Sequence, residues 1–139
     1  MSSQANTSEP RPIVLRHGVK ALVTAADRVL LVKETHSDGS SFWTLPGGGV
    51  ESAESNAAAL RRELAEELYC RARIESERAS FWYAHASCEN TVTRYTVFDC
   101  TLVSHPKPNE ADGILAKRWA DPASPPPSTL LPVRHCLER

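Results

Sequence analysis

The segment from Gly48 to Glu67 constrains this chain more than any other, because it places a glycine-rich loop shortly before an acidic, helix-forming stretch. No glycine or proline interrupts residues 55–68, where alanine, leucine, arginine and glutamate dominate. These are good helix formers, so we predict a helix over this stretch. Its apolar stripe is expected to consist of Ala57, Leu60, Leu64 and Leu68.

Three glutamates on this predicted helix stand at positions i, i+3 and i+4, namely Glu63, Glu66 and Glu67. Side chains at that spacing share one face of a helix, where like charges cost about 0.2–0.5 kcal/mol per pair. A bound cation would remove this repulsion, and hard divalent ions such as Mg²⁺ prefer carboxylate, water and phosphate oxygens. Metal-dependent phosphate chemistry is therefore the leading interpretation, and a solvated acidic face is the alternative. The carboxylates flank the apolar stripe, so we expect them at the edge of the core.

Residues around the glutamates extend this pattern into a known signature. Gly48 is followed after five residues by Glu54, and Glu54 after seven residues by Arg62-Glu63-Leu64-x-Glu66-Glu67. This arrangement resembles the signature of the Nudix (MutT-like) hydrolases, and it is far more specific than a glycine-rich loop alone. The chain departs from the signature at Tyr69, where the family usually has glycine. A left-handed conformation costs tyrosine more than glycine, so the helix exit could differ here.

The resemblance implies an α+β fold, the Nudix-type α/β/α sandwich with a mixed β-sheet, in which the loop and helix carry the site. A length of 139 residues fits one domain. We expect a disordered tail at 1–12 and a single domain at 13–139, of which 122–139 hold a proline-rich break and a terminal helix from Thr129 to Glu138. Strands are predicted over Val19–Thr24, Val29–Lys33, Phe42–Leu45, Arg71–His85, Thr91–Val103 and Ile114–Trp119.

The resemblance assigns a role to most of the polar residues in the segment. The implied metal ligands are Gly47, Gly48, Glu63, Glu66 and Glu67. The implied catalytic residues are Glu66, Glu67 and Arg62. Arg62 is expected to pair with Glu54, which would then be structural, bracing the loop against the helix. Taken alone, Arg62 could be an ordinary surface arginine and the glycines an ordinary turn.

Two further groups of residues complete the expected site. A loop acid, Glu110 or Asp112, would help to bind metal or to activate water, although Gly113 stands where relatives often carry glutamate. A solvated loop is the alternative for this segment. The aromatic residues expected to contact a base or ribose are Trp43, Trp82, Tyr83 and His85. Aromatic residues on strands also form hydrophobic cores, which is the alternative for them.

The implied function is Mg²⁺-dependent hydrolysis, with Mn²⁺ as a substitute, of the pyrophosphate bond in a nucleoside diphosphate linked to another moiety. ADP-ribose-like compounds or nucleoside triphosphates are the expected substrates. One alternative is a pyrophosphohydrolase that removes oxidised nucleotides, and another is a non-catalytic, nucleotide-sensing Nudix domain. Sensor domains commonly lose glutamates of the signature, and all four remain here, which favours the enzyme.

Charge and hydropathy argue against other classes of partner. The net charge of −1 provides no basic footprint for nucleic acid. No apolar run approaches the ~18–20 residues that span a bilayer, and no secretion signal is recognisable. The four cysteines form no Cys-x-x-Cys pair and are expected to be reduced. We therefore expect a cytoplasmic protein that binds a small-molecule nucleotide, with no nucleic acid and no membrane as partner; the family resemblance adds a possible homodimer.

Overall fold

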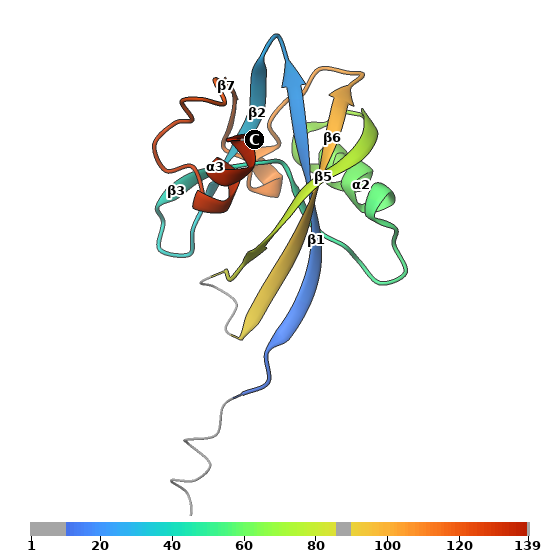
Figure 1. Cartoon of the computed structure of the whole chain (residues 1–139), viewed down its shortest axis with the longest axis vertical. Helices are drawn as coiled ribbons and strands as arrows, with labels where there is room; N and C mark the ends of the chain where they lie inside the picture. Colours follow the sequence, from blue (N-terminus) through green and yellow to red (C-terminus); the bar gives the residue numbers. More distant parts are fainter. Residues whose placement is uncertain (1–10, 86–89, 139) are drawn as a thin grey trace, which may run out of the picture.

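The protein is known from a computed structural model, which describes residues 11–85 and 90–138 and combines a β-sheet with helices on both sides (Figure 1). The strands are β1 (Val14–Ala25), β2 (Arg28–Thr35), β3 (Ser41–Thr44), β4 (Gly47–Gly49), β5 (Ala72–Tyr83), β6 (Thr91–Leu102) and β7 (Ala116–Ala120). The helices are α2 (Asn56–Leu68), the short 3₁₀ helix η1 (Glu110–Asp112) and α3 (Leu131–Leu137). Within the described ranges, no helix is long and apolar enough to cross a membrane.

The sheet is mixed, as predicted. Its main order is β3-β2-β1-β6-β5, with β4 paired to β1 and β7 paired to β2. β1 runs parallel to β6 along Val14–Val23, whereas the other pairings are antiparallel. β1 pairs with β2 only through Thr24 and Ala25, so the two parts of the sheet diverge from that corner. The diverging parts leave room for the loop that carries β4.

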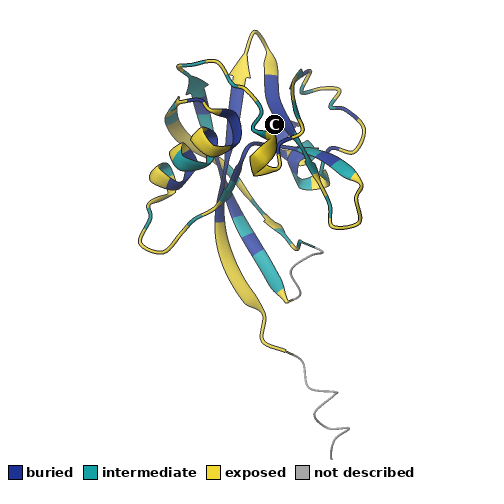
Figure 2. Ribbon diagram, turned by 180° about the vertical axis from the view of Figure 1, so that it is seen from behind, coloured by how far each residue is buried: buried dark blue, intermediate teal, exposed yellow. Residues whose placement is uncertain are grey.

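Alternation along β1 divides the apolar side chains between two cores. Val19, Ala21 and Val23 pack in one core with the buried leucines of α2. Leu22 packs in the other core with Val133 of α3. Because successive side chains of a strand point to opposite faces, a run buried at every position must be covered on both sides. Figure 2 shows this burial between the helices and the exposed far end of β1. The α/β/α sandwich is thereby confirmed.

Helix α2 begins and ends with recognisable caps. The side chain of Ser55 accepts a hydrogen bond of 3.1 Å from the backbone N–H of Ala58. At the other end Tyr69 adopts the left-handed conformation, with φ of 50°, and its N–H donates to the carbonyl of Ala65. The exit therefore keeps the geometry that the family's glycine would give, and the change that Tyr69 suggested does not occur. Tyr69 is exposed, so its side chain meets no steric obstacle there.

Several predicted boundaries were wrong by a few residues. The buried stripe of α2 contains Ala59 in place of Ala57, which is only half-buried. β1 begins at Val14, five residues before the predicted Val19, because its exposed first residues pair with β6 and not with the core. The terminal helix begins at Leu131 and not at Thr129. Of the tail predicted over residues 1–12, residues 1–10 lie outside the described residues.

Candidate metal and substrate site

Glu67 is the most deeply placed carboxylate of the site. Its residue is 6% exposed, and its Oε1 accepts a hydrogen bond of 3.0 Å from the backbone N–H of Gly47. Burial raises the pKa of Glu67 to about 8, against the opposing attraction of Lys20. Because Gly47 belongs to β4 and Glu67 to α2, this bond also ties the glycine loop to the helix. We expected the three glutamates of the helix at the edge of the core, and Glu67 is the one that is buried there.

Glu63, Glu67 and Asp112 form a compact carboxylate cluster, in which one oxygen from each lies within 4.8 Å of the others. Glu63 and Glu67 are one helical turn apart on α2, while Asp112 comes from η1. Burial raises the pKa of Glu63 as well, although the neighbouring Arg62 opposes the shift. Three carboxylates at this separation repel one another unless protons or a cation intervene. Hard oxygen donors in this number suit Mg²⁺ or Mn²⁺.

Asn109 brings η1 to the end of α2, a role that the sequence did not reveal. Its Nδ2 donates a hydrogen bond of 2.7 Å to the carbonyl of Glu66, and its backbone N–H donates one of 2.9 Å to the carbonyl of Glu67. The last carbonyls of a helix have no partner within the helix, so they are available for such bonds. The side-chain oxygen of Asn109 also caps η1 at Ala111. Asp112 reaches the other two carboxylates through this attachment.

Two glycines of the loop lie very close to other parts of the protein. Gly47 has φ of +142°, and a Cβ there would overlap the carbonyl oxygen of Val19. A Cβ on Gly48 would lie 2.5 Å from Oε2 of Glu63. The loop backbone therefore passes directly against a carboxylate of the cluster, as close approach through glycine requires. A role for the carbonyl of Gly47 or Gly48 as a metal ligand stays a prediction.

Arg62 connects the loop to the helix. Its Nε and Nη2 donate to the two carboxylate oxygens of Glu54 at 2.8 and 3.0 Å, and Nη2 also donates to the carbonyl of Gly49 at 2.8 Å. This two-point contact holds the pKa of Glu54 below its usual range. Nη1 of Arg62 lies 3.1 Å from Glu63 Oε2. Arg62 thus orients a carboxylate of the cluster while it braces the loop.

Glu66 stands apart from the cluster, although the sequence ranked it with Glu67. Its side chain is 47% exposed and pairs with Nη1 of Arg62 at 3.2 Å. Neighbouring positions on a helix differ by about 100° in direction, so Glu66 is turned away from Glu67 and toward solvent. Glu63 binds the same Nη1 at 3.1 Å, so Glu66 adjoins the cluster through Arg62, and its metal-binding role stays a prediction.

A cavity of about 290 Å³ opens beside the cluster and has aromatic walls. Tyr83 and His85, two of the residues predicted to contact a base or ribose, line it, and their contact with substrate stays a prediction. Trp82 is 56% exposed and lies on the opposite face of β5 from Tyr83, so it does not reach the cavity. Trp43 packs with the core on the α3 side, and Glu110 is exposed in η1; neither lines the cavity.

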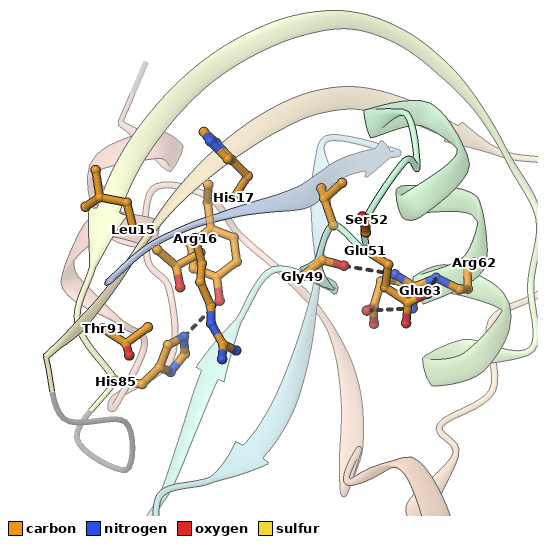
Figure 3. A pocket seen from close by; sticks show the side chains of 13 residues that line it. Leu15, Arg16, His17, Gly49, Glu51, Ser52, Arg62, Glu63, His85 and Thr91 are labelled. Atoms are coloured by element: carbon orange, nitrogen blue, oxygen red, sulfur yellow. Dashed lines mark hydrogen bonds and ion pairs between the residues drawn. The ribbon is translucent and has the colours of Figure 1, made fainter. Parts of the chain in front are cut away.

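A wider, more open cavity of about 710 Å³ adjoins the site (Figure 3). Figure 3 shows Arg16 and His85 on one side of it and the Arg62–Glu63 pair on the other. Nε2 of His85 lies 2.8 Å from the hydroxyl of Tyr95, which lines both cavities. The carboxylate cluster therefore has space for a bound molecule on two sides.

Lys20 and Gly18 are site residues that the sequence reasoning missed. Lys20 is 6% exposed and its Nζ lies 4.9 Å from the centre of the Tyr95 ring. Burial acts to lower the pKa of Lys20, but Glu34, Tyr95 and the cluster carboxylates outweigh it and raise the pKa. A Cβ on Gly18 would overlap that ring, so the glycine makes room for Tyr95. The available signal was a lysine within the apolar run from Val19 to Val23.

Replacing Arg62 by alanine is expected to lower both the melting temperature and hydrolytic turnover, the latter by about 10–100-fold. The substitution removes the donors that bind Glu54 and Gly49 and that orient Glu63. Differential scanning fluorimetry and steady-state kinetics would measure the two effects. Arg61→Ala, at an exposed position of the same helix, is the matched control and should change neither. Equal effects of the two substitutions would contradict the bracing role.

The chain resembles known proteins in sequence and in fold. The family model described as NUDIX domain matches residues 14–135. The fold resembles that of a MutT NUDIX hydrolase from Burkholderia pseudomallei, with TM-score 0.79 and 24% identity over 89% of this chain and 96% of that one. It also resembles a MutT protein from Methanosarcina mazei Go1, with TM-score 0.77 and 19% identity over 94% and 95% of the chains.

The name of a third similar protein of known structure includes a substrate. An ADP-ribose pyrophosphatase from Streptococcus suis 89-1591 superposes with TM-score 0.63 and 22% identity over 88% of this chain and 90% of that one. A search of curated proteins found no match. The family match covers nearly the whole described chain, including the loop, the helix and η1. The chain therefore belongs to the NUDIX family of hydrolases.

Proposed function

We propose that this protein hydrolyses the pyrophosphate bond of a nucleoside diphosphate linked to another moiety, ADP-ribose-like or a nucleoside triphosphate, with Mg²⁺ as cofactor and Mn²⁺ as a substitute. The observation that carries the proposal is the cluster of Glu63, Glu67 and Asp112 at the mouth of an aromatic-walled cavity. Carboxylates suit the metal, and flat aromatic walls suit a base. The pyrophosphate would then lie between the two.

Glu63, Glu67 and Asp112 are the residues that would hold the ion. Held by these carboxylates, a divalent ion would supply Lewis-acid chemistry to the phosphate and to an attacking water. The raised pKa of Glu67 means that it holds a proton near neutral pH when no cation is present. Loss of that proton on metal binding would leave Glu67 as a carboxylate, able to accept a proton from water. Arg62 would keep Glu63 in position throughout.

A screen of nucleotide derivatives with product identification tests this proposal. With Mg²⁺, ADP-ribose should yield AMP and ribose 5-phosphate, whereas a nucleoside triphosphate should yield a monophosphate and pyrophosphate. Chelation should abolish turnover and added Mg²⁺ or Mn²⁺ should restore it. The fold neighbour that acts on ADP-ribose supports including that compound first.

The outcome of the screen separates the alternatives. Turnover confined to oxidised nucleoside triphosphates would favour a nucleotide-sanitising enzyme. Thermal stabilisation by nucleotides without any turnover would favour a nucleotide sensor and would contradict the proposed hydrolysis.

Asp112→Asn is expected to reduce the stabilisation of the protein by Mn²⁺, because it removes one charged oxygen donor from the cluster. A ligand at about 100 times its Kd stabilises the folded state by about 2.7 kcal/mol, and a tenfold weaker site loses about half of that. Thermal unfolding at a series of Mn²⁺ concentrations would measure the change. Glu110→Gln is the matched control, since Glu110 is an exposed acid of the same short helix outside the cluster. If Glu110→Gln has the larger effect, Asp112 is not the loop acid.

A further inference from the structure

Lys20 places a charged group inside the core of the protein. It occupies the middle of β1, in a run from Val19 to Val23 that is buried throughout, and its side chain lines the 290 Å³ cavity. Among the described residues that line this cavity, it is the only lysine or arginine. Burying a charge is costly unless the charge is paired, so we looked for a group that could pair with Lys20.

The ammonium group of Lys20 has no oxygen partner within the described chain. Its direct contact is the ring of Tyr95, at 4.9 Å from Nζ to the ring centre. Glu34, Glu63 and Glu67 attract it, but none of them forms an ion pair or hydrogen bond with it among the contacts of residues 11–85 and 90–138. An ammonium carries three donors, and a ring accepts them only weakly. The donors of Lys20 are therefore available to a molecule in the cavity.

A second buried polar atom in the same cavity also has no partner. Thr44 lines the cavity, and its Oγ1 is fully buried without a hydrogen bond to any described residue. Buried hydroxyls are nearly always hydrogen-bonded, so an unpaired one marks a place where a ligand atom is expected. Lys20 and Thr44 come from different strands, β1 and β3. Both atoms indicate a ligand rich in oxygen acceptors.

The charges around the cavity indicate which kind of ligand atom would accept a hydrogen bond from Lys20. Glu63, Glu67 and Asp112 line the cavity as a cluster, whose negative charge a metal ion would offset. Tyr83 and Tyr95 lie along the aromatic part of the cavity. Lys20 contacts Tyr95 and is attracted by Glu34, Glu67 and Glu63, so its ammonium is near both the aromatic ring and the carboxylates. A phosphate that joins a metal-bound phosphate to a stacked base would pass this point with its negative charge.

We propose that Lys20 binds a non-bridging oxygen of a substrate phosphate, and so positions the pyrophosphate between the carboxylate cluster and the aromatic walls. This inference rests on the proposed function for the identity of its ligand. The Tyr95 ring, lying over Gly18, holds the ammonium in place. Thr44 contributes a hydroxyl to the same ligand.

Methylenediphosphonate is a suitable probe, because it has two phosphoryl groups, no base and no hydrolysable bridge. Calorimetric titration at saturating Mn²⁺, with saturation established for each variant, should show about 10–100-fold weaker binding to Lys20→Met. Lys20→Arg should stay within about fivefold of the unmodified protein, since it keeps the charge. Lys33→Met is the matched control: Lys33 also lies over an aromatic ring, that of Trp43, but outside the cavity.

The outcomes separate the role of Lys20 from the proposed function. A Lys20→Met protein that binds the diphosphonate within twofold of the unmodified protein overturns the inference, as does an unmodified protein that does not bind it. Selective weakening in Lys20→Met without turnover of any nucleotide would leave the inference standing and refute the proposed hydrolysis.

A second measurement avoids dependence on the folding of Lys20→Met. In the unmodified protein with ¹⁵N-lysine and Mg²⁺, the Nζ signal that is missing in Lys20→Arg should shift on addition of methylenediphosphonate. An unchanged signal at saturating probe refutes the contact.

Discussion

Glu67→Gln is expected to lower kcat/KM by about 10²–10⁴-fold. Glu67 is buried beside Glu63 and Asp112, and glutamine offers neither its charge to a metal ion nor a site for a proton from water. Steady-state kinetics with Mg²⁺ and the substrate found by screening would measure the loss. Turnover within tenfold of the unmodified enzyme would remove Glu67 from the mechanism.

The same substitution is expected to stabilise the metal-free protein at neutral and alkaline pH. Burial raises the pKa of Glu67 from 4.5 to about 8, so the folded protein holds a proton that the unfolded chain releases. Stability from this group is complete below about pH 4.5 and falls as the pH rises toward 8. Glutamine removes that dependence, with a gain on the order of a few kcal/mol at pH 8.

Thermal unfolding between pH 4.5 and pH 9 in the presence of a chelator would test this expectation. Glu66→Gln is the control, because Glu66 is half-exposed and no comparable gain is expected from it. A Glu67→Gln protein that is less stable than the unmodified one at pH 8 would contradict the burial argument.

Gly47→Ala is expected to destabilise the fold by roughly 3 kcal/mol or more and to abolish most activity. Gly47 has φ of +142°, and an added Cβ would meet the backbone of Val19 and Lys20, which cannot move aside as a flexible side chain would. The loop would have to leave its pairing with β1, and the N–H that donates to Glu67 would move with it. Chemical denaturation and kinetics would measure the two losses.

Gly49→Ala is the control for this prediction. Gly49 belongs to the same glycine triplet, but its Cβ would meet no atom within 4 Å, and its carbonyl would still accept from Arg62. Stability close to that of the unmodified protein is expected. Similar losses at Gly47 and Gly49 would show that the loop needs flexibility and not the close approach of Gly47 to β1.

Local pattern was enough for most of the secondary structure. The helix over Asn56–Leu68 followed from uninterrupted helix formers, and Ser55 caps it at the predicted start. The sequence analysis missed the first residues of β1. Val14 to His17 are exposed, and they are in a strand because they pair with β6, which is far along the chain. The exit at Tyr69 was also uncertain from the sequence, since the cost of a left-handed tyrosine is small enough for tertiary contacts to offset.

Which of the three glutamates is buried and which faces solvent could not be predicted from the sequence. Spacing places Glu63, Glu66 and Glu67 on one broad helical face, but it does not say which part of that face meets another element. In the folded protein Glu67 is buried under the glycine loop, whereas Glu66 faces solvent and Arg62. The choice between Glu110 and Asp112 likewise depended on how Asn109 attaches η1 to α2.

The sequence by itself determined the family, the loop that precedes α2 and, through the family resemblance, the pairing of Arg62 with Glu54, because these depend on residues close together in the chain. Only the tertiary structure decided that Asp112 joins Glu63 and Glu67, and that Lys20 faces the cavity beside them. The physical reason is that a carboxylate cluster and a buried ammonium are properties of several elements brought together. Hydrogen bonds from Asn109 to the end of α2 bring Asp112 to the cluster, and the cavity beside it is lined by residues of several strands and of α2.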